Sequence, residues 1–206
     1  MNIISASYEI LDELDGKKIL SNITRYGRTC YKSEKEDIYL LNARFVASRI
    51  KAGHESILEH EKITVKITCD RGISHELVRH RLASYSQEST RYCNYAKEDG
   101  DGLTFIRPCY WKKDSADYNH WLTIIQGIDE EYRRFIKTGS TPEQARAILP
   151  NSLKSEIIMT ANLREWRHIL KLRTAHDAHP QMREIMCPLL DELKQKIPVV
   201  FDDISY

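Results

Sequence analysis

The sequence predicts an α+β protein in which helices pack on a small, mainly antiparallel sheet. Helical patterns cover most of the chain, whereas only three short segments have the pattern of strands. These segments also do not alternate regularly with helices, as the strands of a doubly wound parallel sheet do. With 206 residues the chain is long enough for one compact domain, which we expect to span residues 1–206.

The strands are predicted from alternation and from short apolar runs. In residues 61–69, isoleucine, valine and cysteine occupy every second position, with lysine and threonine between them. Such a period of two is typical of a strand with one buried face. Residues 103–107, which end before Pro108, predict a second strand, and residues 156–160 predict a third. We expect a turn at 70–72, directly after the first strand.

The helices are predicted from apolar side chains that recur about every 3.6 residues. Their ranges are 34–52, 73–80, 116–137, 163–173 and 180–196. Thr141 and Pro142 predict one more helix start, because threonine is a good cap and proline suits the first helical position. This helix should end before Pro150, since proline cannot continue a helix.

Composition and charge argue against several classes of protein. Hydrophobic residues make up 41% and charged residues 30%, so a buried core is expected rather than disorder. The 31 basic and 30 acidic residues argue against a nucleic-acid binder that relies on bulk charge. No apolar run approaches the roughly 20 residues that span a bilayer, no export signal is visible, and the five cysteines are scattered. We therefore expect a cytoplasmic protein without membrane or nucleic-acid partners.

Residues 79–92 form the densest polar segment, with three arginines, one histidine and three serines. The planar arginine fork suits phosphate and carboxylate groups, and the interleaved hydroxyls supply neutral donors. A solvated loop is the plainer interpretation. A third interpretation is a nucleic-acid-binding module in which Tyr85, Tyr92 and Tyr95 stack on bases, although the near-zero net charge argues against it.

A second candidate lies in residues 162–173, where one helical stripe carries Asn162, Trp166, Ile169 and Arg173. Residues 162 and 173 are eleven positions apart, so on a helix their side chains point within about 20° of each other and lie roughly 16 Å apart along the axis. Polar groups at both ends of an apolar stripe are unusual for a core face. The alternative is that Arg173 extends to solvent at the helix end, where its charge suits the helix dipole.

Several histidines could in principle bind a metal ion, but their spacing matches no metal-binding motif. Residues 54–60 match neither His-Glu-x-x-His nor its inverted form, and His75 also lacks the required partner. His176 and His179 have helical spacing without a third ligand. We therefore predict no metal site, and we keep as an alternative a metal-dependent hydrolase that uses His54, His60 and His75. No glycine-rich phosphate loop is present either.

Taken together, these segments resemble one family, the flavin-dependent thymidylate synthases. The main motif is Arg-His-Arg at 79–81, followed after seven residues by Ser89. It occurs in the expected order with His-Glu-Ser-x-x-Glu-His at 54–60 and Arg-x-x-Leu-Pro at 146–150. The last segment is Asn-Leu-Arg-Glu-Trp with a later Leu-Arg, in residues 162–173.

The resemblance implies the fold of that family and the reductive methylation of dUMP to dTMP. Methylenetetrahydrofolate would donate the carbon, and FAD reduced by NADPH would supply the hydride. No protein nucleophile would be required. The resemblance further implies a homotetramer whose active sites are shared between subunits.

The resemblance also implies roles for individual residues. The implied FAD contacts are Ser56, Arg79, His80, Arg81, Gln87, Asn162, Arg164 and His168. The implied dUMP contacts are Glu76, Arg79, Gln87, Ser89, Arg91, Arg146 and Arg173. Arg173 would be the catalytic residue that polarises the uracil ring at N3. Many relatives carry Asn-Glu where this chain has Ser86-Gln87, so we expect no acid–base role for Gln87.

Overall fold

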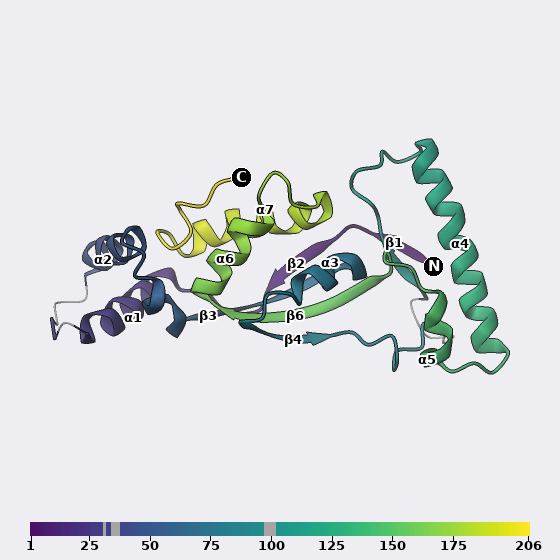
Figure 1. Cartoon of the computed structure of the whole chain (residues 1–206), viewed down its shortest axis with the longest axis horizontal. Helices are drawn as coiled ribbons and strands as arrows, with labels where there is room; N and C mark the ends of the chain where they lie inside the picture. The colour runs from purple at the N-terminus through teal and green to yellow at the C-terminus, as the bar shows by residue number, and fades with distance from the viewer. Residues whose placement is uncertain (31, 34–37, 97–101) are drawn as a thin grey trace. The chain divides into compact units, whose positions relative to one another are not determined.

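The computed structural model describes residues 1–30, 32–33, 38–96 and 102–206 (Figure 1). Its strands are β1 (Asn2–Ile4), β2 (Ser7–Ile10), β3 (Lys62–Asp70), β4 (Ala83–Gln87), β5 (Thr104–Ile106) and β6 (Lys154–Asn162). Its α-helices are α1 (Gly16–Thr29), α2 (Tyr39–Lys51), α3 (Arg71–Leu77), α4 (Ala116–Lys137), α5 (Pro142–Ala145), α6 (Leu163–Arg173) and α7 (Pro180–Lys196). Two 3-10 helices complete the description, η1 (Glu55–His60) and η2 (Arg146–Ile148). The predicted α+β class is confirmed.

The strands form two small sheets. One has four strands in the order β2-β3-β6-β4, and the other pairs β1 with β5 in parallel. In β3 the predicted alternation is confirmed, because Ile63, Val65, Ile67 and Cys69 are fully buried. Strand β3 thus supplies apolar side chains to the core from one of its faces.

The chain groups into two compact units. Unit 1 comprises Met1–Ser7, Ile67–Arg79 and Tyr85–Ile158, and unit 2 comprises Tyr8–Lys66, His80–Ser84 and Met159–Tyr206. The expectation of one domain over residues 1–206 stays a prediction. No helix in the described ranges combines the length and the apolar character that crossing a bilayer requires.

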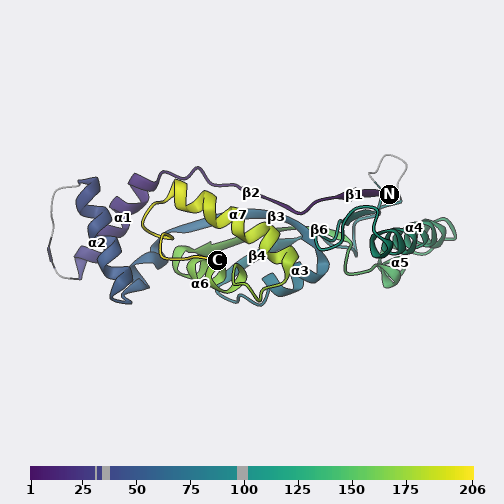
Figure 2. The same cartoon turned by 90° about the horizontal axis from the view of Figure 1, so that it is seen from above.

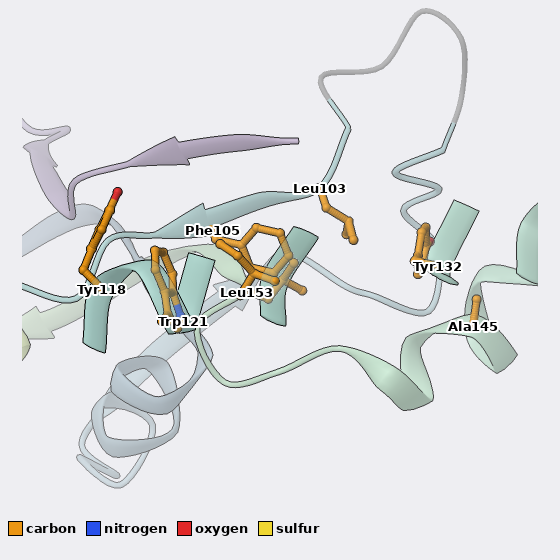
Figure 3. Packing of buried hydrophobic residues seen from close by; sticks show 8 residues of the cluster. Leu103, Phe105, Tyr118, Trp121, Tyr132, Ala145 and Leu153 are labelled. Carbon is orange, nitrogen blue, oxygen red and sulfur yellow. The ribbon is translucent and has the colours of Figure 1, made fainter. Parts of the chain in front are cut away.

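The core of unit 1 packs β5 against α4 and α5. Figure 3 shows the side chains that form it, which are Leu103, Phe105, Tyr118, Trp121, Ile125, Tyr132, Ala145 and Leu153. Helix α4 has its predicted bounds, and it is capped by Ser115, whose hydroxyl accepts from the backbone N–H of Tyr118 at 3.3 Å. The capping serine and the apolar spacing together explain why this helix is predictable from sequence.

Helix α5 confirms the predicted start at Thr141 and Pro142. Thr141 and Gln144 form a reciprocal capping box, in which each side chain accepts from the other residue's backbone N–H. The helix is only four residues long, and the chain continues as η2 before Pro150. The predicted single helix is therefore divided in two, and Arg146 begins the second part.

The core of unit 2 includes α6 and α7, which lie side by side in Figures 1 and 2. Both helices have their predicted bounds. Helix α6 buries Trp166 and Ile169 completely, and α7 buries Met186 and Leu190. The contact between the two apolar faces fixes the direction in which the polar face of α6 points.

The structure differs from the expected turn at 70–72, from the solvated-loop interpretation of residues 83–87 and from the predicted start of the helix at 34–52. The expected turn at 70–72 is the start of α3, because the Asp70 carboxylate accepts from the backbone N–H of Ile73 at 2.7 Å and caps the helix directly after β3. Residues 83–87 form strand β4, so this part of the polar segment is not a solvated loop. The predicted helix at 34–52 begins at Tyr39 in the structure, and residues 34–37 lie outside the described ranges.

Candidate functional site

Helix α6 has one buried face and one polar face. It begins after Asn162, whose side-chain oxygen accepts from the backbone N–H of Glu165 at 2.8 Å. Asparagine is a favoured cap because its short side chain reaches an N–H group that the helix leaves unpaired. Trp166 and Ile169 are fully buried, and the Trp166 Nε1 donates to a carbonyl of β3 at 2.9 Å. The predicted stripe that ends at Arg173 is therefore a packing face along its middle.

A cavity of about 630 Å³ lies against the polar side of α6, within unit 2. Its volume is typical of sites that hold a cofactor or another small molecule. It is lined by Glu55, Glu59, Leu82, Asn162, Arg164, Glu165, Arg167, His168 and Lys171. Three of the predicted FAD contacts, Asn162, Arg164 and His168, are thus brought together at one cavity.

Other predicted FAD contacts of unit 2 lie next to this cavity in the chain. Ser56 is exposed on η1, adjacent to the lining residue Glu55, and Arg81 is exposed and precedes the lining residue Leu82. His80 is 5% exposed and belongs to the buried set. Of the Arg-His-Arg motif, the two residues that belong to unit 2 thus lie next to this wall, with His80 buried and Arg81 exposed to solvent.

The wall of the cavity carries an exposed ion pair. The Nη1 of Arg164 donates to the Oε1 of Glu59 at 2.5 Å, and about half of each side chain is exposed. Pairs of this kind contribute little to stability, since water screens them and both side chains lose freedom. An incoming anion can therefore replace the glutamate at small cost.

A second arginine of α6 is held far more firmly. The Arg167 side chain is 1% exposed and pairs with Glu55 on one side and Asp203 on the other. Its Nη1 also donates to the carbonyl of Val200. The hydrogen bond from Arg167 is the main reason that the pKa of Asp203 is lowered. Arg167 thus joins α6 to η1 and to the C-terminal residues, and it forms a rigid part of the cavity wall.

At the other end of α6, Arg173 is half-buried and in contact with the Arg-His-Arg motif. Its Nε donates to the Nε2 of His80 at 3.0 Å, and the Nδ1 of His80 lies 3.6 Å from the Oε1 of Glu165. Burial lowers the pKa of His80 to about 4, with further contributions from electrostatic repulsion by Arg173 and His168. The interpretation of Arg173 as only a solvated helix end is therefore wrong.

Unit 1 holds the remaining predicted contacts. Gln87 lies on β4, and its amide nitrogen donates to the hydroxyls of Ser74 and Ser155, each at 2.9 Å. Both of its N–H groups are thereby used within the protein. The neighbouring helix α3 carries Glu76 and ends just before Arg79, which is exposed.

Residues 89–91 lie beside α5 in unit 1. The Nε of Arg91 donates to the Oε2 of Glu143 at 3.1 Å, with 54% of each side chain exposed. The Ser89 hydroxyl accepts from the backbone N–H of Arg91 at 3.3 Å. Arg146 is exposed three residues after Glu143. The structure thus brings the two predicted dUMP-binding segments together, although they are more than fifty residues apart in the sequence.

The rival nucleic-acid interpretation loses support at two of its three tyrosines. The Tyr85 hydroxyl donates to the carbonyl of Leu77 at 2.7 Å. The Tyr95 hydroxyl donates to Glu88 at 2.7 Å, and burial, followed by that hydrogen bond, raises the pKa of Tyr95. Tyr92 alone of the three is widely exposed, at 77%.

The metal-dependent hydrolase also loses support. Over the described residues, the structure gathers one potential metal-binding group of three side chains, and it contains none of His54, His60 and His75. The group is His80, Glu165 and His168, whose potential ligand atoms lie within 4.8 Å of one another. The hydrogen bond from Arg173 occupies the Nε2 lone pair of His80 and places a positive charge beside it, which opposes a cation.

Sequence reasoning missed Glu165 and the acidic wall formed by Glu55 and Glu59. Glu165 is 7% exposed although it lies in the first turn of α6, where a glutamate usually serves the helix dipole. The sequence did offer one signal for Glu165, because it directly follows Arg164 and lies three residues after Asn162. Its contact with His80 could not be predicted, because the two residues are 85 positions apart in the sequence.

Comparisons with known proteins show which proteins this chain is similar to. The chain is 41% identical over 145 residues to the flavin-dependent thymidylate synthase of Pyrococcus furiosus, and 42% identical over 145 residues to that of Pyrococcus horikoshii. Each match covers 70% of this chain and 59% of the relative, so the chain spans about three fifths of the length of these proteins. The flavin-dependent thymidylate synthase of Geobacter sulfurreducens is 34% identical over 185 residues, which are 85% of this chain and 78% of the relative.

A family model described as thymidylate synthase complementing protein, Thy1, matches residues 11–199. This range includes all the predicted contacts of both units. The chain therefore belongs to the Thy1 family of thymidylate synthase complementing proteins.

Proposed function

We propose that this protein is a flavin-dependent thymidylate synthase that converts dUMP to dTMP. Methylenetetrahydrofolate supplies the carbon, and FAD reduced by NADPH supplies the hydride. Family membership supports the reaction class. The observation that carries the proposal is the cavity along α6, because it gathers Asn162, Arg164 and His168 and lies on the helix that ends at Arg173.

The residues of this cavity fit a flavin. Asn162 offers an amide and His168 an imidazole, both of which suit a heterocycle with alternating donors and acceptors. Arg164 suits a diphosphate, which can displace Glu59 from the exposed ion pair. When bound, the flavin supplies the redox chemistry, and the protein supplies position and field. Ser56 and Arg81 are exposed next to this wall. Together with Arg79, His80 and Gln87 they are the further proposed FAD contacts.

The residues of unit 1 fit the nucleotide phosphate. A phosphate near −2 needs compensating positive charge and several donors. Arg91 and Arg146 supply the charge, and Ser89 supplies a hydroxyl. Arg91 is paired with Glu143 only through an exposed contact, so dUMP can replace that carboxylate. Glu76, Arg79 and Gln87 are the further proposed dUMP contacts.

Arg173 is the proposed catalytic residue. Carbon 5 of uracil is a poor nucleophile, and negative charge on the ring near N3 and O4 makes it a better one. A guanidinium that is fixed before the reaction stabilises that charge without reorganisation. Ser89 binds rather than attacks, since a serine without an adjacent base is a weak nucleophile.

We also propose a cytoplasmic homotetramer with active sites shared between subunits. Several proposed contacts, among them Ser56, Arg79 and Arg81, are exposed in the single chain. A neighbouring subunit that completes the site gives these exposed arginines a partner. Light scattering checks the mass. Activity recovered on mixing Arg173→Ala with Arg91→Ala, assayed at a dUMP concentration too low for Arg91→Ala alone to turn over, supports shared sites. A fully active monomer would refute them.

The direct test combines a spectrum with an assay. The purified protein should be yellow, with the absorbance of bound FAD, and should form dTMP from dUMP, methylenetetrahydrofolate and NADPH. It should also allow growth of a thymidine auxotroph without thymidine. A colourless protein that takes up no FAD and fails in the auxotroph would falsify the proposal.

A further inference from the structure

Glu165 has no role in the proposed contacts, yet it is buried beside His80. We propose that Glu165 is a positioning residue, which holds His80 in the tautomer that accepts a hydrogen bond from Arg173 and thereby fixes the guanidinium. The consequence for catalysis rests on the proposed function. The relay from Glu165 through His80 to Arg173 is a property of the folded chain and can be measured without turnover.

The geometry assigns a direction to each contact. The Nε of Arg173 is always a donor, so the Nε2 of His80, 3.0 Å away, must carry a lone pair. A neutral imidazole has one N–H group, which then lies on Nδ1. That nitrogen faces the Oε1 of Glu165 at 3.6 Å. A carboxylate can only accept, so Glu165 favours the tautomer that Arg173 requires.

Burial, followed by repulsion from neighbouring groups, lowers the pKa of His80 and keeps it neutral, although the nearby Glu165 carboxylate acts in the opposite direction. Arg173 and the edge-on ring of His168, whose centroid lies 5.8 Å from that of His80, both oppose a positive charge on it. Burial opposes it as well, and the pKa of His80 is lowered to about 4. At neutral pH, therefore, the choice of tautomer and not the state of protonation decides whether the Nε2 of His80 accepts.

The hydrogen bond from the Nε of Arg173 is important for catalysis because the arginine side chain is long and flexible. Its side chain carries about 2 kcal/mol of rotamer entropy, and a displacement of about 1 Å at a reacting group can reduce a rate about 100-fold. A hydrogen bond to Nε sets the plane of the guanidinium. The Nη atoms of that plane are the ones that a planar pyrimidine can meet.

The first test reads the tautomer of His80 directly. Selective ¹⁵N-histidine labelling and the variant His80→Gln identify its ring signals among those of the eight histidines. In the protein as purified, the signals should show Nδ1 protonated and Nε2 unprotonated. In Glu165→Gln the Nε2 signal should move toward the protonated position. A neutral amide oxygen holds the Nδ1–H group less strongly than a carboxylate does, and the amide nitrogen can donate to Nδ1 in the opposite tautomer.

The matched control is Glu61→Gln. Glu61 is a partly buried carboxylate of the same unit that accepts from Asn22 at 2.9 Å, and its substitution removes the same charge. It should leave the His80 signals in place. An unchanged tautomer in Glu165→Gln would overturn the relay. Saturable binding of Zn²⁺ that shifts both His80 and His168 in the unaltered protein would also overturn it, by showing that the cluster is a metal site.

The second test reads the effect on catalysis. In Glu165→Gln, kcat should fall about 10- to 100-fold, while KM for dUMP and the FAD content change little. In an Arg173→Ala background the same substitution should have no further effect, since the arginine that it positions is gone. Equal losses in both backgrounds, or loss of FAD, would contradict the positioning role. Absence of turnover in the unaltered protein would refute the proposed function and leave the tautomer result to decide the relay.

Discussion

The two groups of arginines in this protein differ in how their charges are held. Along α6, Arg167 and Arg173 are buried or half-buried, and named partners fix the guanidinium of each. In unit 1, Arg91 and Arg146 are exposed, and Arg91 has only an exposed ion pair. This chain therefore fixes in advance the charge proposed for catalysis, whereas the charges proposed to bind phosphate remain solvated until the ligand arrives.

The largest expected effect is on turnover at the fixed site. Arg173→Ala should lower kcat by at least about 10²- to 10³-fold while FAD remains bound, because the charge acts on the reacting ring. The measurement is the steady-state rate of dTMP formation together with the absorbance of the bound flavin. Arg44→Ala, which removes an exposed arginine of α2, should leave kcat near its starting value. Loss of flavin from Arg173→Ala would show that the residue serves the cofactor instead.

The next effect is on stability. Arg167→Ala should lower the free energy of unfolding by about 3 kcal/mol, since it breaks a buried ion network and leaves Glu55 and the Val200 carbonyl without their donor. Urea denaturation measures the change. Arg134→Ala removes an exposed pair on α4 and should cost less than about 1 kcal/mol. If both variants lost the same free energy of unfolding, the distinction between arginines fixed by buried partners and solvated arginines would be wrong.

A solvated arginine should act on binding and not on turnover. Arg91→Ala should raise KM for dUMP about 10- to 100-fold, the range expected for one charge-assisted hydrogen bond, with a much smaller change in kcat. The sharper measurement compares dUMP with deoxyuridine, because the variant should lose preference for the phosphorylated form. Lys137→Ala, an exposed cation of α4, serves as the control. An unchanged preference would remove Arg91 from the phosphate site.

Ser89→Ala should have a smaller effect still. We expect kcat/KM to fall less than about 10-fold, because one neutral hydrogen bond is lost and no covalent step depends on the hydroxyl. Steady-state kinetics over a range of dUMP concentrations, from well below KM to saturation, measures this change. A loss of more than about 10³-fold with dUMP binding intact would instead indicate a nucleophile.

The smallest effect concerns acid stability. The pKa of Asp203 is lowered in the folded protein, chiefly by the hydrogen bond from Arg167. A lowered pKa means that the contribution is complete above the ordinary pKa near 3.8 and is lost as the pH falls through the folded value. Asp203→Asn should therefore flatten the acid limb of a stability–pH curve below about pH 4. Because Asp203 is half-exposed, the change should be modest, and an unaltered acid limb would contradict it.

Much of the fold could be predicted because its signals are local. Helices α4, α6 and α7 were predicted with their bounds, since each combines apolar spacing with a capping residue. Helix α1 was missed although Asp15 caps it and Ile19 and Ile23 lie on one face, so its signal was present in the sequence. Strand β4 was missed for a different reason. Its Ala-Ser-Tyr-Ser-Gln sequence shows no apolar alternation, and it becomes a strand only by pairing with β6.

From the sequence alone, the α+β class and the buried face of α6 could be predicted, and the resemblance indicated the residues proposed for the site. Periodicity and motif spacing are properties of neighbouring residues, and the chain carries them whatever its tertiary structure. The hydrogen bond from Arg173 to His80 and the approach of Glu165 to His80 depend on the tertiary structure, because these contacts join positions 85 to 93 residues apart. No local pattern encodes such a contact. It arises when the packing of unit 2 excludes water and leaves each buried polar group to find a partner.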